Sequence, residues 1–90
     1  MLIRFYIYRP EKIKEKTIEV TDKNNYEIRF LLETIIKTIN HELKELKRKG
    51  IITSFTRNTK INNRKYRNKV KNLLFSKQSI NNSLNLIKTI

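Results

Sequence analysis

The chain has 90 residues, of which 21 are lysine or arginine and 8 are aspartate or glutamate, so its formal net charge is +13. A chain of this length buries only about 60–65% of its unfolded surface, which argues against a second domain and against a deep substrate cleft. It contains no cysteine, and no apolar run reaches the ~18–20 residues of a membrane span, which argues against disulfides, thiolate metal sites and a membrane location.

The composition indicates an AT-rich gene. Isoleucine, lysine and asparagine occur 14, 14 and 11 times, whereas alanine is absent and glycine and proline occur once each. Codons of the first three residue types are rich in A and T, and codons of the last three are rich in G and C. We therefore expect an organellar genome, an intracellular parasite, or a small-genome bacterium or its phage. Because Met1 leads directly into a strand-like segment, we expect no signal or transit peptide.

The amino-terminal residues predict a strand and a possible hairpin partner. Apolar and polar residues alternate from residue 2 to residue 8, which predicts a half-buried strand that ends before Pro10. A shorter alternation at residues 17–20 predicts either a partner strand or an edge strand. Residues 21–25 are polar and predict a turn.

The clearest predicted element is an amphipathic helix over residues 26–49. Its apolar residues recur at three- and four-residue steps. They are Ile28, Leu31, Leu32, Ile35, Ile39, Leu43 and Leu46. We expect Asn24 to cap this helix, with Glu27 reaching back in a capping-box-like arrangement. Gly50 stands where a left-handed residue commonly ends a helix.

The remaining residues predict two strands around a basic tip, then a short helix and a last strand. Residues 51–56 and 64–71 read as strands, and residues 57–63 read as the polar tip between them. An extended backbone would place four bases on one face. These are Lys65, Arg67, Lys69 and Lys71. Ser76 is expected to cap a short helix, over which Ile80, Leu84 and Ile87 have helical spacing. A final strand over residues 86–90 is the alternative for the last residues, and in that case the short helix ends at Leu84.

Charge is distributed unevenly along the chain. Residues 1–45 carry nine bases and all eight acids, whereas residues 46–90 carry twelve bases and no acid. An acid-free basic segment is the electrostatic footprint of a phosphate-binding surface. We therefore expect one domain, 1–90, in which residues 1–50 are a scaffold and residues 51–90 form a basic strand or hairpin with a carboxy-terminal element.

Groups suited to catalysis are sparse. His41 is the only histidine and lies on the predicted helix, where a solvated role is expected. The carboxylates alternate with lysines and form no isolated pair for acid–base work. A single glycine argues against a phosphate loop, and no zinc ligand set can be assembled. We expect no enzyme, no metal, no cofactor and no small-molecule substrate.

The basic block between residues 47 and 71 is the candidate RNA-binding site. A solvated face normally mixes charge signs, but this block contains no acid, so bound phosphates would relieve its self-repulsion. The candidate residues are Lys47, Arg48, Lys49, Arg57, Lys60, Arg64, Lys65, Arg67, Lys69 and Lys71. Interspersed Asn, Thr and Ser residues add uncharged donors for phosphate and sugar. No base-reading module is evident, and Tyr66 and Phe55 either stack on bases or face the core.

The order of the predicted elements resembles that of the tenth small-subunit ribosomal protein family. Thr59-Lys60-Ile61 lies where this family has Thr-Lys after its hairpin tip, and Lys77-Gln78-Ser79 is similar to its Lys-x-Ser before the second helix. The family's proline-rich tip is replaced here by residues 54–58, its Ser-Pro-His segment is missing, and residues 11–25 are an insertion. The resemblance implies an α+β fold with a ferredoxin-like sheet, one long amphipathic helix and a basic hairpin extension that reaches into small-subunit ribosomal RNA.

Together these features predict a structural constituent of an organellar ribosome that binds and stabilises rRNA through a basic surface. We expect an organelle-encoded mitochondrial protein with neighbouring ribosomal proteins as further partners; a plastid or the cytoplasm of an AT-rich bacterium are the alternative locations. The alternative functions are a DNA-binding regulator of a phage or plasmid and a basic accessory subunit of a non-ribosomal complex. The expected core is Ile3, Phe5, Ile7, Leu31, Ile35, Ile39 and Phe55.

Overall fold

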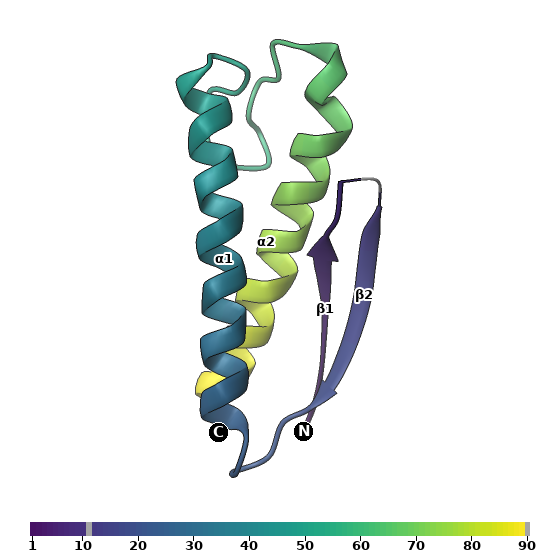
Figure 1. Ribbon diagram of the computed structural model, residues 1–90, viewed down its shortest axis with the longest axis vertical. Coiled ribbons are helices and arrows are strands. Elements are labelled where there is room, and N and C mark those ends of the chain that lie inside the picture. Colours follow the sequence, from purple (N-terminus) through teal and green to yellow (C-terminus); the bar gives the residue numbers. More distant parts are fainter. Residues whose placement is uncertain (11, 90) are drawn as a thin grey trace.

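The computed structural model describes residues 1–10 and 12–89. Its elements in chain order are strand β1 (Leu2–Tyr8), strand β2 (Ile13–Glu19), helix α1 (Asn25–Arg48), the 3₁₀ helix η1 (Arg64–Tyr66) and helix α2 (Arg67–Lys88). Helix α2 packs against both α1 and β1, and the molecule is elongated, measuring 44 × 21 × 18 Å (Figure 1). The two chain ends lie near the same end of the molecule, and the loop between the helices lies at the other.

The two strands form a hairpin, which is one of the two alternatives that the sequence pattern allowed. β1 has the predicted bounds, and β2 pairs with it antiparallel, with Leu2 opposite Glu19 and Tyr8 opposite Ile13. β2 is longer than the alternation at residues 17–20 suggested. Along β1, Ile3 and Phe5 are buried in the core, as expected from the alternating pattern.

The free edge of β1 is covered by serines of α2. Ser76, Ser79 and Ser83 recur at three- and four-residue steps and so share one helix face. Their hydrogen bonds with β1 are Tyr6 N–H to Ser79 Oγ (3.0 Å), Tyr8 N–H to Ser76 Oγ (3.2 Å), Ser83 Oγ to Arg4 C=O (3.0 Å) and Ser76 Oγ to Tyr6 C=O. An open edge presents unpaired backbone groups that would recruit another strand. Here the serine hydroxyls take the place of a third strand.

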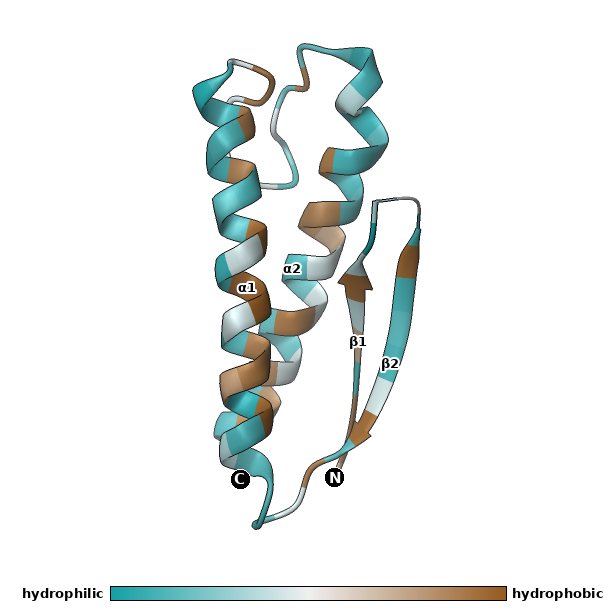
Figure 2. Cartoon of the chain, viewed as in Figure 1, coloured by the Kyte–Doolittle hydropathy of each residue, from teal (hydrophilic) through white to brown (hydrophobic). Residues whose placement is uncertain are grey.

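The long helix α1 confirms the predicted amphipathic helix to within one residue at each end. Most of the predicted stripe is buried, and Ile35 packs half-buried against the core. Leu31 is the exception: 44% of it is exposed, so its placement in the core was wrong. Figure 2 shows hydrophobic residues mainly along the inward sides of the two helices. The stripe therefore forms the contact with α2, and Leu31 lies at its margin.

The predicted capping box at the start of α1 is wrong. Asn24 precedes the helix, but its side chain makes no capping hydrogen bond. Instead Asn24 Oδ1 accepts from Thr21 N–H (2.7 Å), and Nδ2 donates to Glu19 C=O (3.0 Å). Asn24 therefore stabilises the turn between β2 and α1, because its short amide reaches the backbone of that turn more directly than the helix amides.

The end of α1 confirms the expected glycine. Gly50 has φ +75°, Ile51 N–H donates to Leu46 C=O (2.9 Å), and Gly50 N–H donates to Lys47 C=O (3.0 Å). These two bonds define a Schellman motif. The motif reverses the chain and directs the following loop back along the helices.

We expect Gly50→Ala to lower the free energy of unfolding by about 1–2 kcal/mol, since an L-residue is strained at positive φ. A Cβ at this position would meet no atom within 4 Å, so the loss reflects backbone conformation alone. Thermal unfolding followed by circular dichroism would measure it. Gly50→Asn is the control and should lose less, because asparagine tolerates this conformation better; equal losses would contradict the explanation.

The second half of the chain differs most from its prediction. Residues 51–56 form no strand and contribute only one bridge, between Ile52 and Ile61. Residues 64–71 are helical, and α2 continues through the predicted final strand to Lys88; Ile90 lies outside the described residues. Ser76, expected to cap a short helix, lies in the middle of α2. The physical reason is one apolar stripe that continues at helical spacing on both sides of Ser76. It consists of Val70, Leu73, Ile80, Leu84 and Ile87, all buried.

The coarse fold class is confirmed as a small α+β domain. In the part of the chain that the structure describes, the sheet has two strands, so a ferredoxin-like sheet is not confirmed, and the basic extension is a loop and a helix start rather than a hairpin. Ile7 and Phe55, expected in the core, are half-buried and pack against it. Helix α2 supplies further core residues, and two of them, Val70 and Ile87, lie in segments that the sequence assigned to strands.

Candidate nucleic-acid interface

The segments that carry the ten candidate basic residues meet at one end of the molecule. The last turn of α1, the loop at residues 50–63 and the start of α2 meet there, opposite the chain ends (Figure 1). We call this group the basic end: Lys47, Arg48, Lys49, Arg57, Lys60, Arg64, Lys65, Arg67, Lys69 and Lys71. All are exposed except Lys69, which is half-buried. The predicted strands would have spread these segments along a hairpin. The antiparallel helices α1 and α2 bring them together instead.

The helical backbone changes how four of these bases are displayed. The prediction that Lys65, Arg67, Lys69 and Lys71 share one face is wrong, because η1 and α2 replace the strand. Arg67 and Lys71 are four residues apart and lie on the same side of α2, whereas Lys69 points elsewhere. The bases therefore surround the start of the helix instead of forming a row.

Electrostatics at the start of α2 are unfavourable without an anion. Neither η1 nor the first turn of α2 contains an acid, and both begin with bases. The amino-terminal end of a helix carries a partial positive charge, which acids stabilise and bases destabilise. Arg64, Lys65 and Arg67 add to that charge. A bound phosphate would relieve this repulsion.

One member of the basic end already has an acidic partner. Arg48 Nη2 lies 2.9 Å from Glu45 Oε2, one turn earlier on α1. The pKa of the Glu45 carboxyl is lowered because it accepts a hydrogen bond from Arg48 and is attracted by its charge. Glu45 precedes the acid-free segment in sequence but lies beside it in space. Arg48 is consequently the candidate least suited to contact phosphate.

Phe55 lies between the basic end and the core. The Nζ atoms of Lys47 and Lys77 are 5.4 and 5.6 Å from the centroid of its ring, within cation–π range. Phe55 and Tyr66, whose roles the sequence left open, are both half-buried and pack against the core. Lys77 belongs to this surface although it was outside the predicted block.

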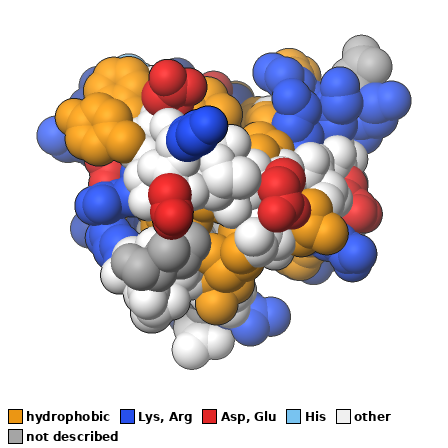
Figure 3. Space-filling view, turned by 90° about the horizontal axis from the view of Figure 1, so that it is seen from below, with side chains coloured by type: hydrophobic (Ala, Val, Ile, Leu, Met, Phe, Trp, Pro, Cys, Tyr) orange, Lys and Arg blue, Asp and Glu red, His pale blue; other side chains and the backbone are white. Residues whose placement is uncertain are grey.

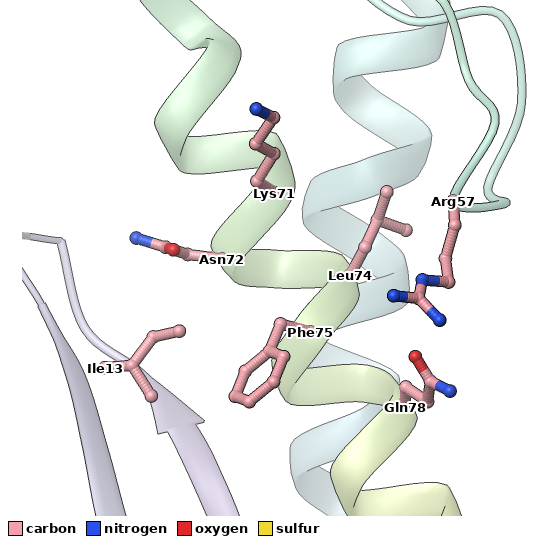
Figure 4. Close-up of a pocket in the computed structure, with 7 residues that line it drawn as sticks. All are labelled: Ile13, Arg57, Lys71, Asn72, Leu74, Phe75 and Gln78. Carbon is pink, nitrogen blue, oxygen red and sulfur yellow. The ribbon is translucent and has the colours of Figure 1, made fainter.

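The sequence prediction missed a groove along α2. Three adjoining hollows share Arg57 and Gln78, and the largest, of about 500 Å³, lies between the hairpin and α2 (Figure 4). We call them together the Phe75 groove. Its aromatic lining residues are Tyr6, Phe55 and Phe75. Its basic residues are Arg4, Arg57, Lys71 and Lys77. Its amide residues are Asn72, Gln78, Asn81 and Asn82. None of the residues found to line it is acidic.

A helical reading of residues 67–88 would have revealed part of this groove. Lys71, Phe75, Gln78 and Asn82 follow at steps of four, three and four, so they share one outward face of α2. Arg57 had no such signal, because it reaches Gln78 only after the loop folds back beside α2, as Figure 4 shows.

The opposite end of the molecule has a different character. Figure 3, viewed from that end, shows acidic side chains among lysines, arginines and exposed hydrophobic side chains. Two of the exposed hydrophobic residues of α1 are Tyr26 and Phe30, which are 76% and 66% exposed. The charge asymmetry of the sequence is thus a spatial asymmetry as well.

His41 is exposed on α1, as expected. Among residues 1–10 and 12–89, no cluster of three or more potential metal ligands is present. Over the same residues, neither helix has the length and apolarity needed to cross a membrane.

Comparison of the chain with protein-family models, with curated proteins and with solved structures finds no match. The function is therefore argued from the basic end and the Phe75 groove.

Proposed function

We propose that the protein binds structured RNA by neutralising backbone phosphates with the basic end. The observation that carries this proposal is that two helix ends and the loop between them, which together bear ten basic residues, meet at one end of the molecule. Contacts to phosphate position a protein on nucleic acid and account for most of the salt-dependent affinity. The uncharged Asn and Thr side chains of the loop supply further donors to phosphate and sugar.

Structured RNA is favoured over duplex DNA because aromatic and amide side chains lie next to the lysines and arginines of the basic end. Folded RNA presents loops and bulges whose bases stack on aromatic side chains and pair with amides. The Phe75 groove, which adjoins the basic end through Arg57 and Lys71, offers both kinds of side chain. The chain shows no recognition-helix spacing for the major groove.

Within this class, we propose a structural constituent of an organellar ribosome, in the mitochondrion, with ribosomal RNA of the small subunit and neighbouring ribosomal proteins as partners. Small size, high basic charge and a composition typical of an AT-rich gene support this setting. The proposal does not need a ferredoxin-like sheet, because the binding residues lie on helix ends and a loop.

Replacing Lys60, Arg64, Lys65 and Arg67 together by glutamine is expected to weaken RNA binding and to flatten its salt dependence. Each lost phosphate contact removes roughly 0.7–0.9 from the slope of log K against log salt concentration, so four contacts remove roughly 2.8–3.6. Fluorescence anisotropy with a folded RNA at several salt concentrations measures both effects.

The matched control is glutamine at Lys14, Lys16, Lys23 and Lys44, four exposed lysines of the acid-bearing half. This variant has the same net charge and should retain most of the slope. If both variants lose equal affinity, net charge rather than the basic end is responsible. Tighter binding of duplex DNA than of folded RNA would instead favour a DNA-binding regulator.

The ribosomal setting has its own test. Sucrose-gradient fractionation of gently lysed source cells or organelles should place the chain with one ribosomal subunit, and ribonuclease treatment should release it. Migration with another complex that ribonuclease leaves intact would contradict this setting and favour an accessory subunit.

A further inference from the structure

We propose that the Phe75 groove binds an unpaired base of the RNA whose phosphates the basic end holds. This inference rests on the proposed function and names the part of the RNA that the groove takes. It predicts a preference for RNA with a flipped-out or bulged nucleotide over fully paired RNA, which the basic end alone would not produce.

Phe75 supplies a stacking surface. It lies in the middle of α2, yet 48% of it is exposed. Its ring centroid is 5.0 Å from that of Tyr6, with the rings tilted by 53°, a favourable aromatic arrangement that holds Phe75 in place. Figure 4 shows the Phe75 side chain between Ile13 of the hairpin and the side chains of Arg57 and Gln78, all of which line the largest hollow. A base that enters there would stack on a ring that is already oriented, and such stacking tolerates any base.

Polar groups at the rim suit the edge of a base and the adjoining phosphate. The amides of Asn72 and Gln78 each carry donors and acceptors, and both line the hollow with Arg57 and Lys71. The last two also belong to the basic end, so a backbone bound there leads directly to the groove. Arg4 is ion-paired with Glu15 at 3.3 Å, and we leave it out of the expected contacts.

The size and charge of the Phe75 groove favour an unpaired base of an RNA chain as its occupant. The largest hollow, at about 500 Å³, falls within the range of about 300–1,000 Å³ that is usual for small-ligand sites. None of the lining residues among 1–10 and 12–89 is acidic, which favours an anionic chain. A second copy of this protein would bring another net charge of +13 and would be repelled.

The test uses two RNA hairpins that differ only in one unpaired 2-aminopurine, a fluorescent adenine analogue. The full chain is expected to bind the bulged hairpin on the order of 10-fold more tightly and to change the fluorescence of the unpaired base by stacking. Phe75→Leu should abolish both the preference and the fluorescence change, yet keep salt-dependent binding of the paired hairpin. Phe75→Tyr should retain them, because the ring is kept.

Phe30→Leu is the matched control, because it makes the same change at an exposed phenylalanine of α1, outside the groove, and should leave the preference unchanged. Gln78→Ala, an exposed position on α2, provides an independent variant and should reduce the preference. Circular dichroism checks that each variant is folded.

The outcomes separate this inference from the proposed function. Equal binding of both hairpins with a steep salt dependence would overturn the base-binding groove and leave phosphate binding by the basic end standing. A preference that survives Phe75→Leu would also overturn it. Salt-independent or absent binding of both hairpins would overturn both proposals.

Discussion

Replacing Phe5 by alanine is expected to lower the free energy of unfolding by about 3–5 kcal/mol. Phe5 is 0% exposed and is the largest fully buried side chain. It lies on β1, where the hairpin meets the core formed by both helices. The substitution removes the burial of an aromatic ring and leaves a cavity that a small domain refills poorly. Urea unfolding followed by circular dichroism measures the change.

Phe30→Ala is the control for this prediction. Phe30 is 66% exposed on α1, so the same change there should alter stability by no more than about 0.5 kcal/mol. Small domains are stable by only about 5–15 kcal/mol in total. If Phe5→Ala lowers the free energy of unfolding no more than Phe30→Ala does, the hairpin does not pack on the helices in solution.

Replacing Ser76 by alanine is expected to cost about 2–4 kcal/mol. Ser76 is 0% exposed, and its hydroxyl donates to Tyr6 C=O and accepts from Tyr8 N–H at 3.2 Å. Without the hydroxyl, two backbone groups of β1 lose their partner, and each orphaned buried group costs about 1–3 kcal/mol. Urea unfolding measures the loss of stability, and hydrogen exchange at the Tyr8 amide should become faster.

Asn85→Ala serves as the comparison for Ser76, since Asn85 is exposed on the same helix and its loss should change stability by no more than about 0.5 kcal/mol. Ser83→Ala, which removes a single bond of 3.0 Å to Arg4 C=O, should fall between the two. If Ser76→Ala proves as mild as Asn85→Ala, water must reach the edge of β1 and replace the serine.

The serine contacts also matter for the proposed interface. They hold α2 along β1, and this places Phe75 against Tyr6. The same alignment sets the start of α2 at the same end of the molecule as the last turn of α1. A protein whose serines no longer hold the strand edge is therefore expected to lose the Phe75 groove before it loses the basic end.

Local signals predicted the first half of the chain well. The period-2 pattern of β1, the period-3.6 stripe of α1 and the lone Gly50 each reflect a short-range preference of the backbone. The predicted capping box was wrong because the Asn24 side chain reaches two backbone groups of the preceding turn instead. The predicted core position of Leu31 was wrong because spacing alone does not distinguish the margin of an apolar stripe from its centre.

Local sequence patterns did not predict helix α2. Residues 64–71 alternate bases with other residues and fit a strand as well as the first turns of a helix. The buried stripe of α2 is interrupted by Ser76, Ser79 and Ser83, which look like surface or capping residues until their partner is known. A serine is buried at low cost only when its hydroxyl is bonded, and the partner here is the edge of a strand about 70 residues earlier.

The sequence by itself determined the coarse class of the domain, strand β1, helix α1 and the acid-free basic character of the second half, because charge and periodicity are properties of neighbouring residues. Only the tertiary structure decided that basic residues of α1, the loop and α2 meet at one end of the molecule, and that Arg57 lies beside Gln78 in a groove with Phe75. These relations join segments far apart in the chain. They depend on how α2 packs between β1 and α1, which no local pattern specifies.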